Sequence, residues 1–496
     1  MSKTTDSTDA PQGARIETHQ RVGLILGPAI FLLMLATEGR QEAMSVEAWR
    51  AAAAGLWMAI WWATEAIPVP ATAFLPLVLF DPLGIASIRD AAAPYANPTI
   101  YLFFGGFLMA LALERWNLHR RIALAILDRT GTDGKRLIGG FMLVCALLSM
   151  WMTNTSTTMM LLPIVLSVIG TIRDNVTDLS AKEVSDFEIA MLLGLAYAAS
   201  IGGLATLVGT PPNALLIGYL REQYAIDISF ARWMTVGIPV TFVMLPAAWL
   251  LLTRVLHPVR VPASAAVRAH LHELRDHLGP MSVPEKRIAV LFAALILAWM
   301  FRKPVTDLFG IEGVSDTGIV MTIAVLLFVL PSGSDEQARL MRWEDAVRLP
   351  WGVLILFGGG LSLAAAVDST GLAQWLGESL APLNTLGIVA LVLGAVTMVI
   401  FLTELTSNLA TTATLLPVMG AIAVQAGLPP LYLTVPITIA ASCAFMLPVA
   451  TPPNAIVFAT GRITIPQMVR AGIALNLLGI CLVTLVALYL APNVLL

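Results

Sequence analysis

Charged residues are scarce in this chain of 496 residues: they make up 12% of it, whereas hydrophobic residues make up 57%. Soluble globular domains carry about 25% charged residues. The chain therefore has too little polar surface for a soluble protein of this length, and we expect a polytopic protein of the cell (inner) membrane. The net charge of −3 and the lack of a long basic run argue against nucleic acid as a partner.

The chain is also poor in cysteine. Its three cysteines, Cys145, Cys443 and Cys481, are an odd number and each lies in an apolar run, so they are expected to be small core residues and not a disulfide framework. Residues 1–20 lack a short apolar core that ends in small residues, so no cleaved signal peptide is expected. These residues are predicted to form a disordered cytoplasmic tail.

Two polar segments are repeated within apolar runs. Residues 153–158 read Thr-Asn-Thr-Ser-Thr-Thr, and residues 406–412 read Thr-Ser-Asn-Leu-Ala-Thr-Thr; we call them the first and second hydroxyl clusters. Each precedes a Thr-Pro-Pro-Asn motif, at residues 210–213 and 451–454. The Asn-to-Asn offset is 254 for the clusters (154 to 408) and 241 for the motifs (213 to 454), which indicates an internal duplication.

The apolar runs beside each hydroxyl cluster are shorter than the about 20 residues that a membrane span requires. One alternative is a single long helix with a Thr-rich face. The alternative that we favour is a re-entrant helical hairpin, at residues 137–172 and again at residues 386–424, which turns at the cluster. Irregular backbone at membrane depth is tolerated only where protein or water surrounds it, so such turns imply a lined cavity.

Two further pairs of segments extend the repeat. Helices at residues 187–220 and 432–460 are interrupted by the Thr-Pro-Pro-Asn motifs, because two prolines remove two amide donors and leave carbonyls near Gly209 without partners. Residues 98–113 and 351–366 contain neighbouring glycines that let helices approach closely or bend. We expect residues 351–366 to form a broken segment.

Basic residues indicate how the two halves are oriented. Residues 115–136 carry six Lys and Arg, so this loop is predicted to be cytoplasmic, whereas residues 349–461 contain none. The second hairpin is therefore expected to open to the outside, which makes the repeats inverted and places a binding site between them near the midplane.

The predicted fold is thus all-α, with about 11 transmembrane helices plus two re-entrant hairpins. It comprises a first half (residues 21–256), a cytoplasmic linker (257–287) and a second half (288–496). The linker carries His270, His272 and His277, but no cysteine or carboxylate constellation accompanies them, so a solvated amphipathic helix is favoured over a metal site.

The repeated polar residues suggest a binding chemistry. Hydroxyls, Asn side chains and unpaired carbonyls suit Na⁺, and hydroxyls and amides also donate hydrogen bonds to a carboxylate or sulfate. Neither the hydroxyl clusters nor the Thr-Pro-Pro-Asn motifs contain Lys, Arg or His. A bound dianion would lack a fixed countercharge, and cations that arrive with it would supply one, which favours symport. The alternative is that these residues only pack helices together.

These motifs resemble a known family. The segment Trp-Trp-Ala-Thr-Glu-Ala-Ile-Pro at residues 61–68, the two hydroxyl clusters and the two Thr-Pro-Pro-Asn motifs are similar to the divalent anion:sodium symporters, which carry di- and tricarboxylates and sulfate with sodium. The similarity runs from about Arg21 to the C-terminus. It implies a homodimer in which a transport domain moves across the membrane against a scaffold domain, as an elevator does.

The resemblance also implies ligands. A first sodium site would use Ser149, Thr153, Asn154 and the carbonyl of Gly209, and a second would use Thr403, Ser407, Asn408 and the carbonyl of Ala450. Substrate carboxylates would contact Asn154, Thr155, Asn408, Thr210, Thr451 and Pro452. The family's Ser-Asn-Thr word reads Thr153-Asn154-Thr155 in the first copy, which keeps the hydroxyl. The second copy ends in Leu409 and so lacks one substrate hydroxyl.

The sequence thus predicts a secondary active transporter that couples Na⁺ to small divalent anions such as succinate or malate. Alternatives are a sodium-independent dicarboxylate exchanger, a sodium-coupled sulfate or citrate carrier and, from another class, an ion channel. An enzyme is not expected, because no base and nucleophile pair accompanies the helix breaks. Glu404, near the second cluster, is either a solvated helix end or a group whose protonation couples transport to pH.

Overall fold

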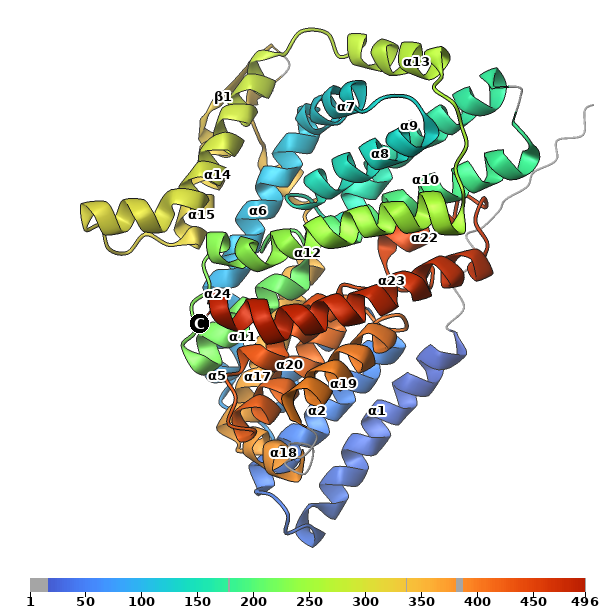
Figure 1. Ribbon diagram of the computed structural model, residues 1–496. Coiled ribbons are helices and arrows are strands. Elements are labelled where there is room, and N and C mark those ends of the chain that lie inside the picture. The colour runs from blue at the N-terminus through green and yellow to red at the C-terminus, as the bar shows by residue number, and fades with distance from the viewer. Residues whose placement is uncertain (1–16, 177–178, 336, 381–386, 496) are drawn as a thin grey trace, which may run out of the picture.

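The computed structural model describes residues 17–176, 179–335, 337–380 and 387–495, and this part of the chain is almost entirely helical (Figure 1). Within it, nine helices are long and apolar enough to cross a membrane, and four shorter apolar helices accompany them. The predicted all-α polytopic fold is therefore confirmed. Large apolar side chains face outward, among them Ile25 (71% exposed), Phe242 (76%) and Leu308 (77%), as expected of surfaces in contact with lipid.

The first helices form one side of the molecule. Helix α1 (Thr18–Thr37) packs along α2 (Val46–Thr64), and the short helices α3 (Val69–Thr72), α4 (Leu75–Leu79) and α5 (Ile88–Ala92) follow. Most of the predicted disordered tail, residues 1–16, lies outside the described residues. Its predicted end at residue 20 is wrong, because Thr18 already belongs to α1.

Helices α6 (Pro98–Arg115) and α17 (Trp351–Ser369) contain the neighbouring glycines, and both are continuous. The predicted break within residues 351–366 is therefore wrong. The glycines allow close packing instead: a Cβ at Gly359 would lie 2.6 Å from Cβ of Ala73, which leaves no room for a side chain there.

The two repeats have the same order of elements. A pair of helices joined by a short polar turn comes first, and a second pair separated by an unwound segment follows. In the first repeat these are α8 (Gly134–Ser149), α9 (Asn154–Asn175), α10 (Ala181–Gly203) and α11 (Pro211–Tyr224). In the second they are α19 (Gly387–Leu402), α20 (Asn408–Gln425), α21 (Leu431–Ala441) and α22 (Pro452–Phe458). We call residues 150–153 and 403–407 the first and second turns.

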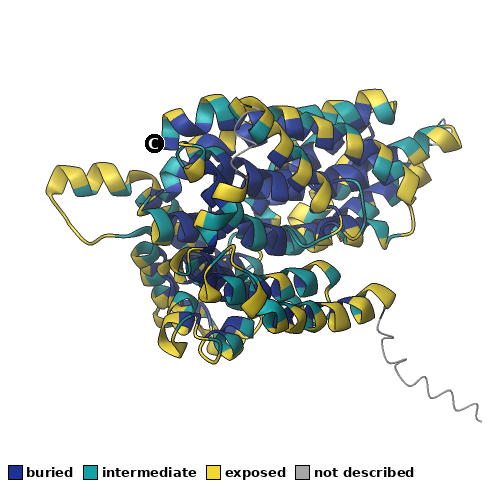
Figure 2. Ribbon diagram, turned by 90° about the horizontal axis from the view of Figure 1, so that it is seen from below, coloured by how far each residue is buried: buried dark blue, intermediate teal, exposed yellow. Residues whose placement is uncertain are grey.

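The remaining elements connect and enclose the repeats. Helices α12 (Phe230–Leu250) and α23 (Ile465–Leu485) lie side by side between the α8–α10 group and the α17–α20 group (Figure 1). Buried residues fill the centre, and exposed residues cover the outer helices (Figure 2). The others are α7 (Leu118–Thr130), α13 (Ala265–Asp276), α14 (Val283–Phe309), α15 (Asp316–Val329), β1 (Pro331–Ser334), β2 (Gln337–Arg339), α16 (Trp343–Ala346), α18 (Leu372–Leu380) and α24 (Ala491–Leu495).

The predicted linker, residues 257–287, contains the amphipathic helix α13, and its last five residues already belong to α14. Two of its histidines contact other side chains. His272 Nε2 lies 2.8 Å from Asp128 Oδ1, and His270 Nε2 lies 2.7 Å from Ser167 Oγ. No cluster of three or more metal-ligating side chains occurs in the part of the chain that the structure describes.

Candidate functional site

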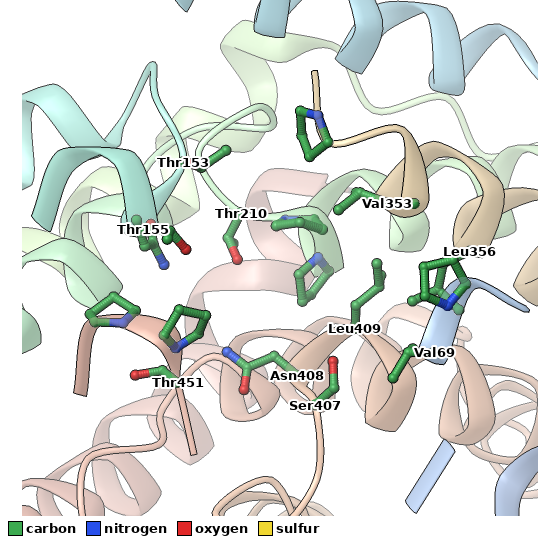
Figure 3. A pocket seen from close by; sticks show the side chains of 18 of the residues that line it. Val69, Thr153, Thr155, Thr210, Val353, Leu356, Ser407, Asn408, Leu409 and Thr451 are labelled. Carbon is green, nitrogen blue, oxygen red and sulfur yellow. The ribbon is translucent and has the colours of Figure 1, made fainter. Parts of the chain in front are cut away.

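A cavity of about 1300 Å³ lies where the turns and the unwound segments of both repeats meet (Figure 3). Ten of the twelve residues predicted for the site line it: Thr153, Asn154, Thr155, Gly209, Thr210, Ser407, Asn408, Ala450, Thr451 and Pro452. The other two, Ser149 and Thr403, are fully buried behind the wall and contact the two asparagines. The folded chain thus brings together residues that lie up to 303 positions apart (149 to 452).

The first turn places Asn154 at the start of α9. Thr153 Oγ1 accepts the N–H of Ser156 (3.2 Å) and so caps the helix. Ser149 Oγ lies 2.6 Å from Asn154 Oδ1 and 2.7 Å from the carbonyl oxygen of Ala199. A hydroxyl has one hydrogen, and both neighbours are acceptors. Three oxygens therefore crowd together with one hydrogen among them, an arrangement that suits a cation.

The unwound segment after α10 brings the Gly209 carbonyl to the same place. Pro211 and Pro212 have no amide hydrogen, and the N–H of Asn213 donates to Thr210 O (3.2 Å). A Cβ built on Gly203 would lie 2.7 Å from Asn154 Oδ1 and 3.0 Å from the Gly209 oxygen. Both oxygens therefore border Gly203.

The second turn repeats the hydroxyl–amide and hydroxyl–carbonyl contacts of the first turn. Thr403 Oγ1 lies 2.9 Å from Asn408 Oδ1 and 2.8 Å from the carbonyl oxygen of Ala441. Thr412 Oγ1 donates to the Asn408 carbonyl (2.8 Å), as Thr158 Oγ1 does to the Asn154 carbonyl (2.8 Å). The sets of oxygens at both turns fit Na⁺, which binds carbonyl and hydroxyl oxygens at helix breaks.

Sequence reasoning missed several contributors to these sets. The carbonyls of Ala199 and Ala441 carry no side-chain signal that could have revealed them. For Asn213 and Asn454 the sequence predicts no role beyond membership of the Thr-Pro-Pro-Asn motifs. Their side-chain amides donate to carbonyls of the unwound segments, to Thr206 O (2.8 Å) and Leu447 O (3.0 Å) respectively, and so hold those segments in place. The signal for this role was the recurrence of Asn in both motifs.

The middle of the cavity is favourable for an anion, although no basic side chain of the described residues lies there. Helices α9, α11 and α20 all begin at its wall, and the N-terminus of a helix carries roughly half a positive charge. Ser407 makes no side-chain capping bond within the described residues, so the first amides of α20 keep their donors for a ligand. Val69, Val353, Leu356 and Leu409 supply an apolar part of the wall (Figure 3).

Charged side chains stand at the mouth of the cavity. The lining includes Glu65 and Glu114 at the C-terminal ends of α2 and α6, together with Glu17 and His19 at the start of α1. Arg348 Nη2 pairs with Glu114 Oε1 at 2.9 Å. Among the described residues of the lining, His19 and Arg348 are the basic ones. Glu114 and Arg348 lie at the C-terminal end of α6, where the basic segment 115–136 begins.

Glu404 does not line the cavity. Its side chain is 3% exposed and accepts hydrogen bonds from three backbone N–H groups, so of the two alternatives for Glu404 the solvated helix end is wrong. A buried carboxylate is stable here because the unwound segment of the second repeat turns its peptide groups toward it.

Comparisons with known proteins identify the family of this chain. The family model described as the sodium:sulfate symporter transmembrane region matches residues 19–495. Two proteins named sodium-dependent dicarboxylate transporter SdcS are similar to the chain. That of Staphylococcus saprophyticus is 41% identical over 479 residues, and that of Staphylococcus aureus strain bovine RF122 is 42% identical over 480. Each match covers 96% of this chain and 92% of the relative.

Two solved structures share the fold at low sequence identity. The antimetabolite efflux pump MtrF of Neisseria gonorrhoeae has a TM-score of 0.56 at 14% identity, with 93% of this chain and 94% of that one covered. The YdaH transporter of Alcanivorax borkumensis has a TM-score of 0.53 at 15% identity, with 95% and 99% covered. The chain is thus a multi-pass membrane transporter and not an enzyme, and it belongs to the divalent anion:sodium symporters, the family of the sodium:sulfate symporter transmembrane region.

Proposed function

We propose that the protein carries a small dicarboxylate across the cell membrane together with Na⁺. The observation that supports this most is the pair of matched oxygen clusters around Asn154 and Asn408, which border one cavity whose middle has no basic side chain among the described residues. Two Na⁺ and one dianion have no net charge, so the ions offset the desolvation that a lone dianion would suffer in the membrane. The names of the relatives support a dicarboxylate as the substrate.

In this proposal the residues have distinct roles. Ser149, Thr153, Asn154 and the Gly209 carbonyl hold the first Na⁺, joined by the carbonyl of Ala199. Thr403, Ser407, Asn408 and the Ala450 carbonyl hold the second, joined by that of Ala441. The substrate carboxylates accept hydrogen bonds from Asn154, Thr155, Asn408, Thr210, Thr451 and the start of α20, while the backbone at Pro452 shapes the wall.

The movement that we propose is of the elevator type. The polar part of the wall comes from α8–α11 and α19–α22, which would travel together as the transport domain with the two hairpins re-entering the membrane from opposite sides. Apart from Leu409 on α20, the apolar part comes from α3 and α17 of the scaffold domain. An apolar surface offers an ion few partners, so the transport domain with its bound ions would move along the scaffold domain without strong contacts to hold it. The homodimer implied by the family resemblance stays a prediction, which the mass of the purified protein in detergent would test.

The experiment is uptake of labelled succinate into proteoliposomes, with Na⁺ outside in one arm and choline in the other. We expect saturable, concentrative uptake in the Na⁺ arm alone. Equal exchange in both arms would favour a sodium-independent exchanger, and large unitary currents would favour a channel. Unlabelled malate, citrate and sulfate as competitors identify the preferred anion, and stronger competition by citrate or sulfate than by malate would overturn the assignment of a C4 substrate.

A further inference from the structure

One acidic side chain lies beside the second cation cluster without lining the cavity. Glu404 follows Thr403 in the second turn and is almost completely buried. Its carboxylate accepts hydrogen bonds from four groups. They are the N–H of Phe445 (2.8 Å), of Met446 (3.0 Å) and of Leu447 (3.0 Å), and Nδ2 of Asn476 on α23 (2.7 Å). Three consecutive peptide groups thus enclose an anion that belongs to the protein itself.

These hydrogen bonds connect the two parts of the second cation cluster. Residues 445–447 belong to the unwound segment between α21 and α22, and Ala450 lies three residues further along it. Thr403, whose hydroxyl contacts Asn408 Oδ1, is the residue before Glu404. The carboxylate therefore fixes the distance between the turn that supplies the side-chain oxygens and the segment that supplies the Ala450 carbonyl.

The charge of Glu404 is balanced by hydrogen bonds alone within the described residues, since none of their ion pairs includes it. The first repeat has no counterpart. The offset of 254 that relates the asparagines leads from Glu404 to Met150 (404 − 254 = 150), which is neutral. There the carbonyl of Met150 accepts a hydrogen bond from the Thr206 hydroxyl. The two oxygen clusters match, but within the described residues a buried carboxylate directly follows the cluster's first hydroxyl residue in the second repeat and a neutral methionine does so in the first.

We propose that Glu404 is a positioning residue for the second cation site: it holds the unwound segment against the second turn, and its charge makes this site bind Na⁺ more tightly than the first. A unit charge about 10 Å away, at an effective dielectric constant of about 20, changes the affinity of a monovalent cation by about tenfold. The second site therefore fills first as the Na⁺ concentration rises. This inference rests on the proposed function, because it assumes that both clusters bind Na⁺.

The test measures Na⁺ binding and not transport. Purified protein is titrated with NaCl against choline chloride at constant ionic strength, and the melting temperature is recorded at each concentration, since a ligand stabilises the state that binds it. Glu404→Gln removes the charge and keeps the size. Asn476→Leu removes one hydrogen bond and keeps the charge, and Met150→Gln is the neutral control at the matching position of the first repeat.

We expect Glu404→Gln to raise the half-maximal Na⁺ concentration about tenfold, and the two controls to stay within about twofold of the wild type. An unchanged half-maximal concentration in a folded Glu404→Gln protein would overturn the inference and leave the proposed function intact. If the wild-type protein shows no stabilisation by Na⁺, the proposed function itself fails.

A second pair of variants covers the case in which Glu404→Gln does not fold. Thr403→Val removes a hydroxyl from the second cluster, and Ser149→Ala removes the matching one from the first. We expect Thr403→Val to lose the response to low Na⁺ concentration and Ser149→Ala to keep it. Loss of that response in Ser149→Ala alone would assign the tighter site to the first repeat and overturn the inference.

Discussion

A single added methyl group at Gly203 tests the first cation site. In the structure, a Cβ at this position would lie 2.7 Å from Asn154 Oδ1, 3.0 Å from the Gly209 oxygen and 3.4 Å from Asn154 Nδ2. Real Cβ atoms essentially never approach another atom to 2.7 Å, and a contact of 3.0 Å is unusually tight, so Gly203→Ala must push the Asn154 amide away from Ser149 or displace the unwound segment. Either shift separates oxygens that we expect to bind the same ion.

The magnitude follows from losing one contact to a charged group, which is worth about 1.5–3 kcal/mol. At about 1.4 kcal/mol for each factor of ten, this corresponds to a loss of about 10- to 100-fold in apparent Na⁺ affinity. The assay is the initial rate of succinate uptake into proteoliposomes as a function of external Na⁺. We expect the half-maximal Na⁺ concentration to rise by this factor, and the Na⁺-free melting temperature to change little.

Gly170→Ala is the matched control. Gly170 lies on α9, the helix that begins with Asn154, and no atom outside its own stretch of helix lies within 4 Å of the Cβ that alanine would add. The substitution should leave Na⁺ dependence unchanged and stabilise the helix by up to about 1 kcal/mol. A folded Gly203→Ala protein with the Na⁺ dependence of the wild type would refute the assignment of Asn154 and Gly209 to one site.

Three further variants test other parts of the account. Leu409→Thr adds a hydroxyl to the cavity wall and should lower the half-maximal succinate concentration by about 2- to 10-fold, the value of one hydrogen bond; a weaker response to succinate would contradict this role. Arg348→Gln removes a positive charge from the cavity lining and should slow the initial rate of uptake, more at low than at high ionic strength. Equal slowing at both ionic strengths would exclude electrostatic attraction of the anionic substrate by Arg348. Trp151→Leu removes an indole whose ring centroid lies 5.8 Å from that of Phe230 and 5.1 Å from that of Phe292. It should destabilise the protein by about 1–3 kcal/mol and so lower the melting temperature. An unchanged melting temperature would show that this aromatic cluster does not stabilise the first turn.

The sequence revealed the repeated elements because polar residues within apolar runs are conspicuous. The two hydroxyl clusters and the two Thr-Pro-Pro-Asn motifs all lie at helix starts beside one cavity, at α9, α20, α11 and α22. Proline explains this for the motifs, since a helix that begins at proline loses no hydrogen bond. The prolines and polar residues in the sequence thus indicate where these helices begin.

Other features had no local signal. The glycines of α17 are predicted to break the helix, but the helix is continuous and Gly359 packs tightly against Ala73; the sequence does not tell which neighbour a glycine faces. The environment of Glu404 was equally hidden. Three of its four partners are backbone amides 41–43 residues away, and every residue except proline offers the same N–H. Contacts to backbone groups leave no pattern in side chains, so only the folded chain reveals them.

The most direct test of the central claim compares wild type with Asn154→Ala and Asn408→Ala in one uptake experiment. Proteoliposomes containing each protein receive labelled succinate under an inward Na⁺ gradient, after gel filtration has shown that each variant elutes as the wild type does. We expect succinate to accumulate with the wild type and to remain at the level of empty liposomes with both variants. Accumulation at the wild-type rate in either variant would show that its asparagine holds neither Na⁺ nor substrate, and would contradict the two-cluster site.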